Sequence, residues 1–125
     1  MKFREFTTKR GTKILLGKSA ENNEELIKQT EPSEEVLHTK SPGSPFVNIK
    51  ENPKFGDVKI AAIICARYSR DWRDNKKDVL VHRFKGKDTY KEKRMPKGTF
   101  GVKKFKTIKV KKKDILEFEK NAENR

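Results

Sequence analysis

Cysteine and histidine are scarce in this chain of 125 residues, which contains one Cys and two His. A single cysteine cannot form an internal disulfide. Cys65 lies in the apolar run 60–66, which predicts a small buried hydrophobic residue there. His38, His82 and Cys65 do not fall at the spacings of metal ligands. We therefore expect structural or surface roles for both histidines, and we predict no metal and no cofactor.

Long apolar runs are also missing. Only 32% of the residues are hydrophobic, and no uncharged apolar stretch is long enough to cross a bilayer. No signal-peptide pattern opens the chain, so we expect a cytoplasmic protein without a membrane partner.

Signatures of catalysis are equally hard to find. Residues 11–19 resemble a phosphate-binding P-loop, but five residues separate the two glycines where that motif needs four. The intervening residues 14–16 (Ile-Leu-Leu) suit a strand better than a phosphate cradle. Ser44 lacks the glycine frame of a hydrolase nucleophile. The sequence therefore predicts no enzyme.

Positive charge is what the chain has in excess. Its formal charge is +14, from 32 Lys and Arg against 18 Asp and Glu. Residues 1–60 hold 11 basic and nine acidic side chains, whereas residues 61–125 hold 21 and nine. The excess thus belongs almost entirely to the second half. Solubility explains the first half well, but the asymmetry favours a polyanionic partner for the second.

Short apolar patterns bounded by turn residues predict a folded chain. We expect strands at 3–8, 13–17, 35–39, 46–50, 79–84, 89–91, 100–102 and 105–110, with Val79, Val81 and Phe84 on one face. We expect a helix to about Thr30 capped by Ser19, a long helix 58–72 capped by Asp57, and a short last helix capped by Asp114. These elements predict a single compact α+β domain over residues 1–120, with two main helices on a mixed, mainly antiparallel sheet. Residues 121–125 are expected to be a frayed tail.

Basic side chains concentrate near aromatic ones at two places. Arg67, Arg70 and Arg73 would share one face of the long helix, while Tyr68 and Trp72 suit either core packing or base stacking. The later lysines form a stripe that suits a phosphate backbone or the protection of an edge strand. We expect all these cations to meet as one positive face. The expected nucleic-acid contacts are Arg67, Tyr68, Arg70, Tyr90, Lys91, Lys93, Arg94, Lys97, Lys104 and Lys106.

Taken in order, several segments resemble the NFACT-R domain, a family of RNA-binding domains. They are Gly17-Lys18-Ser19-Ala20 with Asn23-Glu24, then Leu37-His38, Pro42-Gly43-Ser44, Tyr68-Ser69-Arg70, Tyr90-Lys91, Gly98 and Gly101. The resemblance extends from Phe3 to about Val110. Two positions depart from the family pattern: Pro45 stands where many members have His, and Glu34 or Glu35 where many have Asp.

The resemblance, to a standalone archaeal-type member, implies RNA binding with a link to tRNA, translation or ribosome-associated quality control. Larger family members join this domain to further NFACT modules and a coiled coil. The family motif falls on Asn23, Glu24, His38, Gly43, Ser44 and Ser69, besides Tyr68, Arg70 and Lys91. We favour a structural role for Asn23 and Glu24.

The implied partner is RNA, either tRNA or ribosomal RNA, with DNA as an alternative. Two other functions stay open at this point: a protein-docking module of a ribonucleoprotein complex, and an RNA-modifying enzyme that uses His38 and Ser44. The sequence leaves the oligomeric state open.

Overall fold

The computed structural model describes residues 2–123, and its central element is a six-stranded sheet in the order β1-β2-β4-β3-β5-β8. Every neighbouring pair in this sheet is antiparallel. The strands are β1 (Arg4–Thr7), β2 (Lys13–Leu16), β3 (Glu35–Thr39), β4 (Val47–Ile49), β5 (Val79–Lys85) and β8 (Lys106–Val110). Two further strands, β6 (Thr89–Tyr90) and β7 (Gly101–Val102), form a separate antiparallel ribbon.

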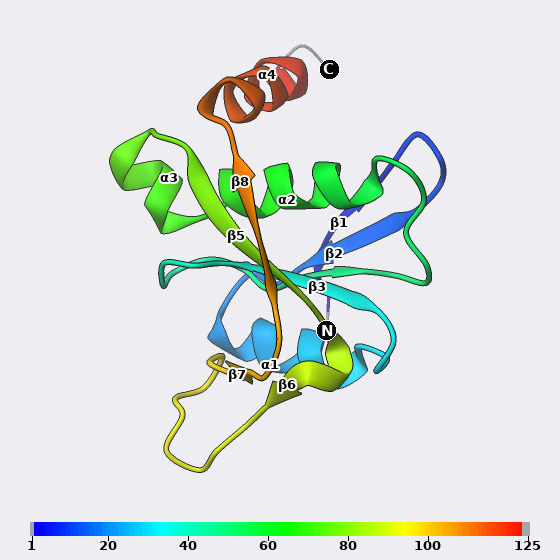
Figure 1. The fold of residues 1–125 in the computed structure, drawn as a ribbon, viewed down its shortest axis with the longest axis vertical. Coiled ribbons are helices and arrows are strands. Elements are labelled where there is room, and N and C mark those ends of the chain that lie inside the picture. The colour runs from blue at the N-terminus through cyan, green and yellow to red at the C-terminus, as the bar shows by residue number, and fades with distance from the viewer. Residues whose placement is uncertain (1, 124–125) are drawn as a thin grey trace.

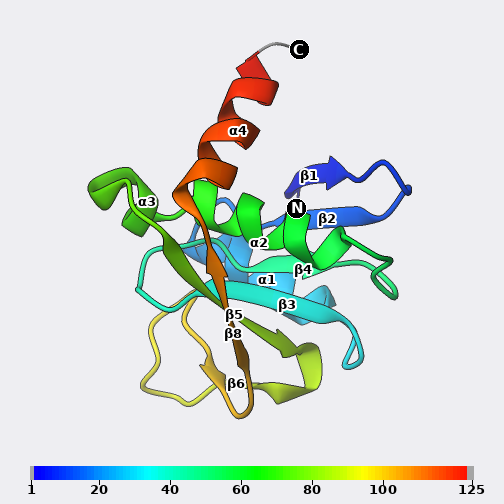
Figure 2. The same cartoon turned by 45° about the horizontal axis from the view of Figure 1, so that its top comes forward.

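The helices lie on both faces of the sheet (Figures 1 and 2). They are α1 (Ala20–Gln29), α2 (Asp57–Arg67), α3 (Arg70–Asn75) and α4 (Lys112–Glu123), with a short 3-10 helix at Gly86–Asp88. Helix α2 crosses one face, whereas α1 and the β6–β7 ribbon lie under the other (Figure 1). No helix in the described part of the chain is both long and apolar enough to cross a membrane.

Strand alternation divides the core into two clusters, one for each face of the sheet. Leu37 of β3 packs with Ala62 and Ile64 of α2 in the larger cluster. The preceding residue, Val36, packs in the smaller cluster with Leu26 of α1. A chain that is only 32% hydrophobic can therefore fill two thin apolar layers around one sheet.

The expected fold class is confirmed: the chain forms one α+β domain with an antiparallel sheet. The cap of the first helix is also confirmed, because the Ser19 side chain accepts a hydrogen bond from the Asn22 amide (3.1 Å). The two predicted N-terminal strands pair with each other as an antiparallel hairpin, with Thr7 opposite Lys13.

The prediction of a single long helix at 58–72 was wrong. Helix α2 ends at Arg67, and Ser69 caps a separate helix, α3, by accepting a hydrogen bond from the Trp72 amide (3.1 Å). Arg67 and Arg70 therefore do not share a helix face, because the chain changes direction between them. Asp57 lies inside the first turn of α2, where its carboxylate accepts a hydrogen bond from the Thr12 hydroxyl (2.6 Å).

Three smaller expectations also differ from the structure. Phe84 packs in the cluster on the α1 face, opposite Val79 and Val81, because it stands at an odd spacing from them. Asp114 does not cap the last helix, which begins at Lys112 and is the longest of the four at 12 residues. The expected tail begins at residue 121, whereas α4 continues to Glu123; residues 124 and 125 lie outside the described part.

Replacing Ser69 with alanine should lower the free energy of unfolding by about 1–2 kcal/mol. Ser69 is buried, and its hydroxyl both donates to the Ala66 carbonyl (2.6 Å) and accepts from the Trp72 amide. Urea denaturation measures the change, with the exposed Ser33→Ala as the control. Equal stability of the two variants would contradict this role for Ser69.

Candidate nucleic-acid interface

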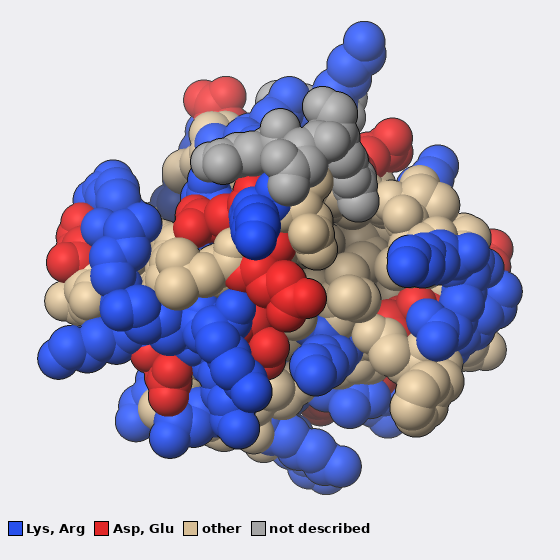
Figure 3. Space-filling view, turned by 90° about the horizontal axis from the view of Figure 1, so that it is seen from above, with Lys and Arg blue, Asp and Glu red and all other residues tan. Residues whose placement is uncertain are grey.

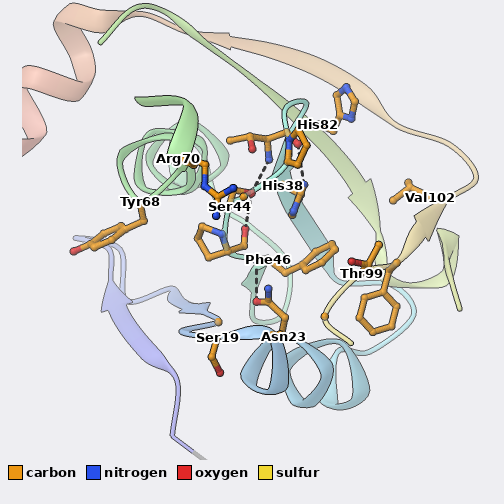
Figure 4. Close-up of a pocket in the computed structure, with 18 of the residues that line it drawn as sticks. Ser19, Asn23, His38, Ser44, Phe46, Tyr68, Arg70, His82, Thr99 and Val102 are labelled. Atoms are coloured by element: carbon orange, nitrogen blue, oxygen red, sulfur yellow. Dashed lines mark hydrogen bonds between the residues drawn. The ribbon is translucent and has the colours of Figure 1, made fainter. Parts of the chain in front are cut away.

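A cleft of about 860 Å³ opens on the α1 side of the sheet, where four loops meet. These loops connect β2 to α1, β3 to β4, α2 to α3, and β6 to β7. Arg70 and Ser44 lie on one side of the cleft, and Thr99 and Val102 lie on the other (Figure 4). Side chains far apart in the sequence therefore surround one concave surface.

The charged side chains that line this cleft are all cationic: Arg4, Lys18, Lys40, Arg70 and Lys97. No Asp or Glu in the part of the chain that the structure describes lines it. Among the described residues, only Lys97 has a carboxylate within ion-pair distance, that of Glu21 at 3.9 Å. Both partners of that pair are more than half exposed, so the pair is weak. The cleft is therefore an uncompensated positive site.

The Pro-Gly-Ser loop fixes the position of Arg70. Gly43 has a φ of +90°, and its carbonyl accepts a hydrogen bond from the Arg70 amide (2.8 Å). A Cβ on Gly43 would lie only 3.0 Å from the Arg70 Cβ, so glycine permits this close approach. The Ser44 hydroxyl accepts a hydrogen bond from the Thr39 amide (3.0 Å) and closes the loop. Gly43 and Ser44 thus have structural roles that bring Arg70 to the cleft.

Helix α1 holds two loops of the cleft through neighbouring side chains. The Asn23 carbonyl oxygen accepts a hydrogen bond from the Phe46 amide (3.2 Å), at the end of the Pro-Gly-Ser loop. The Glu24 carboxylate accepts hydrogen bonds from the Gly98 amide (2.6 Å) and the Lys91 ammonium (2.9 Å). These contacts join α1 to two of the loops that surround the cleft.

The loop between β6 and β7 is folded around Lys91. Its ammonium donates to the Glu24 carboxylate and to the carbonyls of Pro96 and Thr99, both at 2.7 Å. Gly98 has a φ of +83°, and a Cβ there would lie 2.7 Å from the Ala20 Cα. The loop therefore packs against the first turn of α1, which places Lys97 at the cleft.

Aromatic rings cover the inner wall of the cleft. Phe46 packs against His38 (4.4 Å between ring centroids) and, edge to face, against Phe100 (5.6 Å). Phe105 stacks on His82 at 4.0 Å with an interplanar angle of 24°. Burial lowers the pKa of both histidines below the ordinary value of 6.5. Both rings are therefore neutral at pH 7, so they supply stacking surface rather than charge.

His38 is held by its own strand end. Its Nδ1 lies 2.8 Å from the Thr39 carbonyl, so in the neutral ring the proton is on Nδ1. The Ser44 hydroxyl, expected to act with His38 in the enzyme alternative, instead binds the Thr39 amide and the Pro45 carbonyl. The nearby Cys65 thiol is buried, and burial raises its pKa to about 12. Within the described residues, no group of three or more His, Cys, Asp or Glu side chains could hold a metal.

The ten expected contact residues are distributed over several parts of the structure. The cleft includes three of them: Tyr68, Arg70 and Lys97. Lys104 and Lys106 line a second hollow of about 310 Å³. Tyr90, Lys91, Lys93 and Arg94 line neither cavity. On the α2 and α4 face, carboxylates interrupt the cations (Figure 3).

Arg67 and Lys91 are both committed to contacts within the domain. The Arg67 guanidinium binds the Glu119 carboxylate at 2.6 Å, and the same carboxylate accepts from the Trp72 indole (3.2 Å). Arg67 therefore docks α4 onto α2. All three hydrogens of the Lys91 ammonium are matched by acceptors, so this residue organises its loop.

Arg4, Lys18 and Lys40 line the cleft as cations that were not predicted, and Phe100 and Phe105 are unpredicted parts of its wall. Lys18 follows Gly17 inside the motif that carried the family resemblance, so a signal was present for it. Arg4 and Lys40 lie outside the motif segments that carried the family resemblance, and only the folded chain brings them to the cleft. Arg4 contacts the start of the α2–α3 connection, since its guanidinium lies 4.3 Å from the Tyr68 ring.

Comparisons with known proteins relate this chain to a domain family and to a solved structure. A family model described as "NFACT protein RNA binding domain" matches residues 2–104. None of the curated proteins matches the chain. Among solved structures, the C-terminal part of the fibronectin/fibrinogen-binding protein from Streptococcus suis is 25% identical and has a TM-score of 0.80. The match covers 94% of this chain and 49% of that one, so the chain spans about half the length of that structure.

The contact between Glu24 and Gly98 should respond to pH. Burial alone would raise the pKa of Glu24, but the hydrogen bonds from Lys91 and Gly98 outweigh it and lower the pKa below 4.5. The stabilisation is therefore complete above pH 4.5 and is lost as the pH falls through the lowered value. An NMR titration that follows the Gly98 amide should show a midpoint below 4.5 in the wild type and no such step in Glu24→Gln. A midpoint at or above 4.5 would contradict the contact.

Proposed function

The chain belongs to the NFACT protein RNA-binding domain family, and from this premise we propose that the cleft of about 860 Å³ is the surface that binds RNA. The observation that carries the proposal is the cleft's charge: five cations line it, and none of the described carboxylates does. Phosphate oxygens are the groups that such a site attracts, and the release of their counterions drives binding.

Arg70 is the central phosphate contact in this proposal. Its planar guanidinium suits a bidentate contact with phosphate oxygens. Its backbone is already fixed by the Gly43 carbonyl, so less freedom is lost when RNA binds. Arg4 and Lys18 approach the cleft from β1 and the start of α1, and Lys40 approaches from the end of β3. A phosphate backbone that enters the cleft therefore meets cations from several directions.

We extend the proposal to the cellular partner. The family resemblance supports tRNA or ribosomal RNA, and with it a role in translation or ribosome-associated quality control. That role would place the protein in the cytoplasm. Competition among tRNA, duplex RNA, single-stranded RNA and duplex DNA at equal ionic strength separates these partners. Preference for DNA over every RNA would contradict this part of the proposal.

Arg70→Gln should weaken RNA binding roughly tenfold at low salt, because it removes a charge-assisted contact from the centre of the cleft. If five phosphates are neutralised, the wild-type log–log salt slope is about −3.5 for a single strand, and the variant's slope is shallower by about 0.7. Fluorescence anisotropy over a salt series measures both quantities.

Arg73→Gln is the matched control for this change. Arg73 is also on α3, but it pairs with Asp74 (3.0 Å) and does not line the cleft. The affinity of the Arg73→Gln variant for RNA should stay within about twofold of the wild-type affinity. Equal losses in the two variants would place the binding surface elsewhere. No binding of any RNA at low salt would favour the protein-docking alternative.

A further inference from the structure

Phe105 is the feature of the cleft that phosphate binding leaves unexplained. Half of its surface is exposed (50%), although it stands between two lysines in a polar segment. The other large hydrophobic side chains that the described part exposes are Phe55, Ile60, Tyr90 and Leu116. None of these lines either cavity, whereas Phe105 lines both. An exposed aromatic ring at the junction of two basic hollows is suited to stack against an aromatic ligand.

The geometry of Phe105 suits the stacking of a planar group. His82 covers one face of the ring, with centroids 4.0 Å apart and planes inclined by 24°. His82 is itself held in β5, directly opposite His38 of β3, so the ring rests on the sheet. By contrast, Phe100 is covered by the Lys91 ammonium (4.7 Å) and by the edge of Phe46. Phe105 therefore offers the wall's accessible aromatic surface.

Phe105 also connects the two hollows into one path. Beyond it, the second hollow contains Lys104 and Lys106, for which no ion pair exists among the described residues. The other charged residues that line that hollow are Arg83, Lys85, Glu35 and Asp88, and Arg83 and Lys85 both pair with the buried Glu35 carboxylate, at 2.7 and 2.8 Å. An RNA strand that leaves the cleft past Phe105 would thus meet Lys104 and Lys106 as the next cations without an ion pair.

We propose that the cleft selects unpaired RNA, with one base stacked on Phe105 and the backbone continuing from Arg70 to Lys104 and Lys106. The inference rests on the proposed RNA-binding function and names its ligand class. In an A-form duplex the bases are paired and their faces are covered, so a duplex cannot present a base to Phe105. Stacking on an aromatic side chain is tolerant of sequence, since every base has a flat face. The expected ligand is therefore a loop or a single-stranded end of any sequence.

The test compares a short labelled single-stranded RNA with the same RNA annealed to its complement, using anisotropy. The wild type should bind the single strand about tenfold more tightly. Phe105→Leu should lose about tenfold in affinity for the single strand and leave duplex affinity and thermal midpoint unchanged. Phe105→Trp should keep the preference, and the fluorescence of its new indole should be quenched by the single strand alone.

Phe55→Leu is the matched control, because Phe55 is 89% exposed and lines neither cavity. It should bind both RNAs as the wild type does. If Phe105→Leu binds the single strand as tightly as the wild type does, or the wild type prefers the duplex, the stacking inference is overturned. In either case, RNA binding with a steep salt dependence would leave the proposed function standing. If the wild type binds neither RNA and shows no salt dependence, the proposed function and the stacking inference are both overturned.

Discussion

The hydrogen bonds that Asn23 and Glu24 accept are the constraint on which the cleft depends. Through the Phe46 amide and the Gly98 amide, two neighbouring side chains of α1 hold two different loops that line the cleft. Ser19 fixes the start of this helix, because its side chain accepts a hydrogen bond from the Asn22 amide. The cleft is thus an assembly of loops with little regular structure of its own, and α1 is the scaffold that keeps their cations at fixed positions.

The net charge of +14 does not show which cations are available to a ligand, because some of them are paired within the domain. Three cations form ion pairs that join elements of the domain. Arg67 joins α4 to α2, Lys91 joins the β6–β7 loop to α1, and Arg83 joins β5 to β3. Arg4, Lys18, Lys40 and Arg70 have no such partner among the described residues, and these four line the cleft. Composition indicates that a polyanion is the partner, whereas the ion pairs decide which side chains remain available to it.

Local signals in the sequence were enough to predict most of the elements and the family. Caps such as Ser19 and alternating runs such as 35–39 act within a few residues, so a pattern reveals them. The break after Arg67 was missed because the helix was extended from the apolar run 60–66 to Trp72, past Ser69, whose capping role competes with helix continuation. The pairing of Glu24 with Lys91 joins residues 67 positions apart, and no local pattern encodes it. Because such long-range contacts cannot be read from local patterns, Lys91 was predicted as an RNA contact, whereas Arg4 and Lys40 were not.

The central claim is that RNA occupies the cleft on the α1 side of the sheet. A titration of the isotope-labelled protein with a short single-stranded RNA, followed through its backbone amide resonances, tests this claim most directly. The largest shifts should fall on Lys18, Gly43, Gly98 and Phe105, and the amides of α3 and α4 beyond Arg70 should hardly move. Shifts concentrated on α4 and the end of α3, with the cleft amides unchanged, would contradict the account.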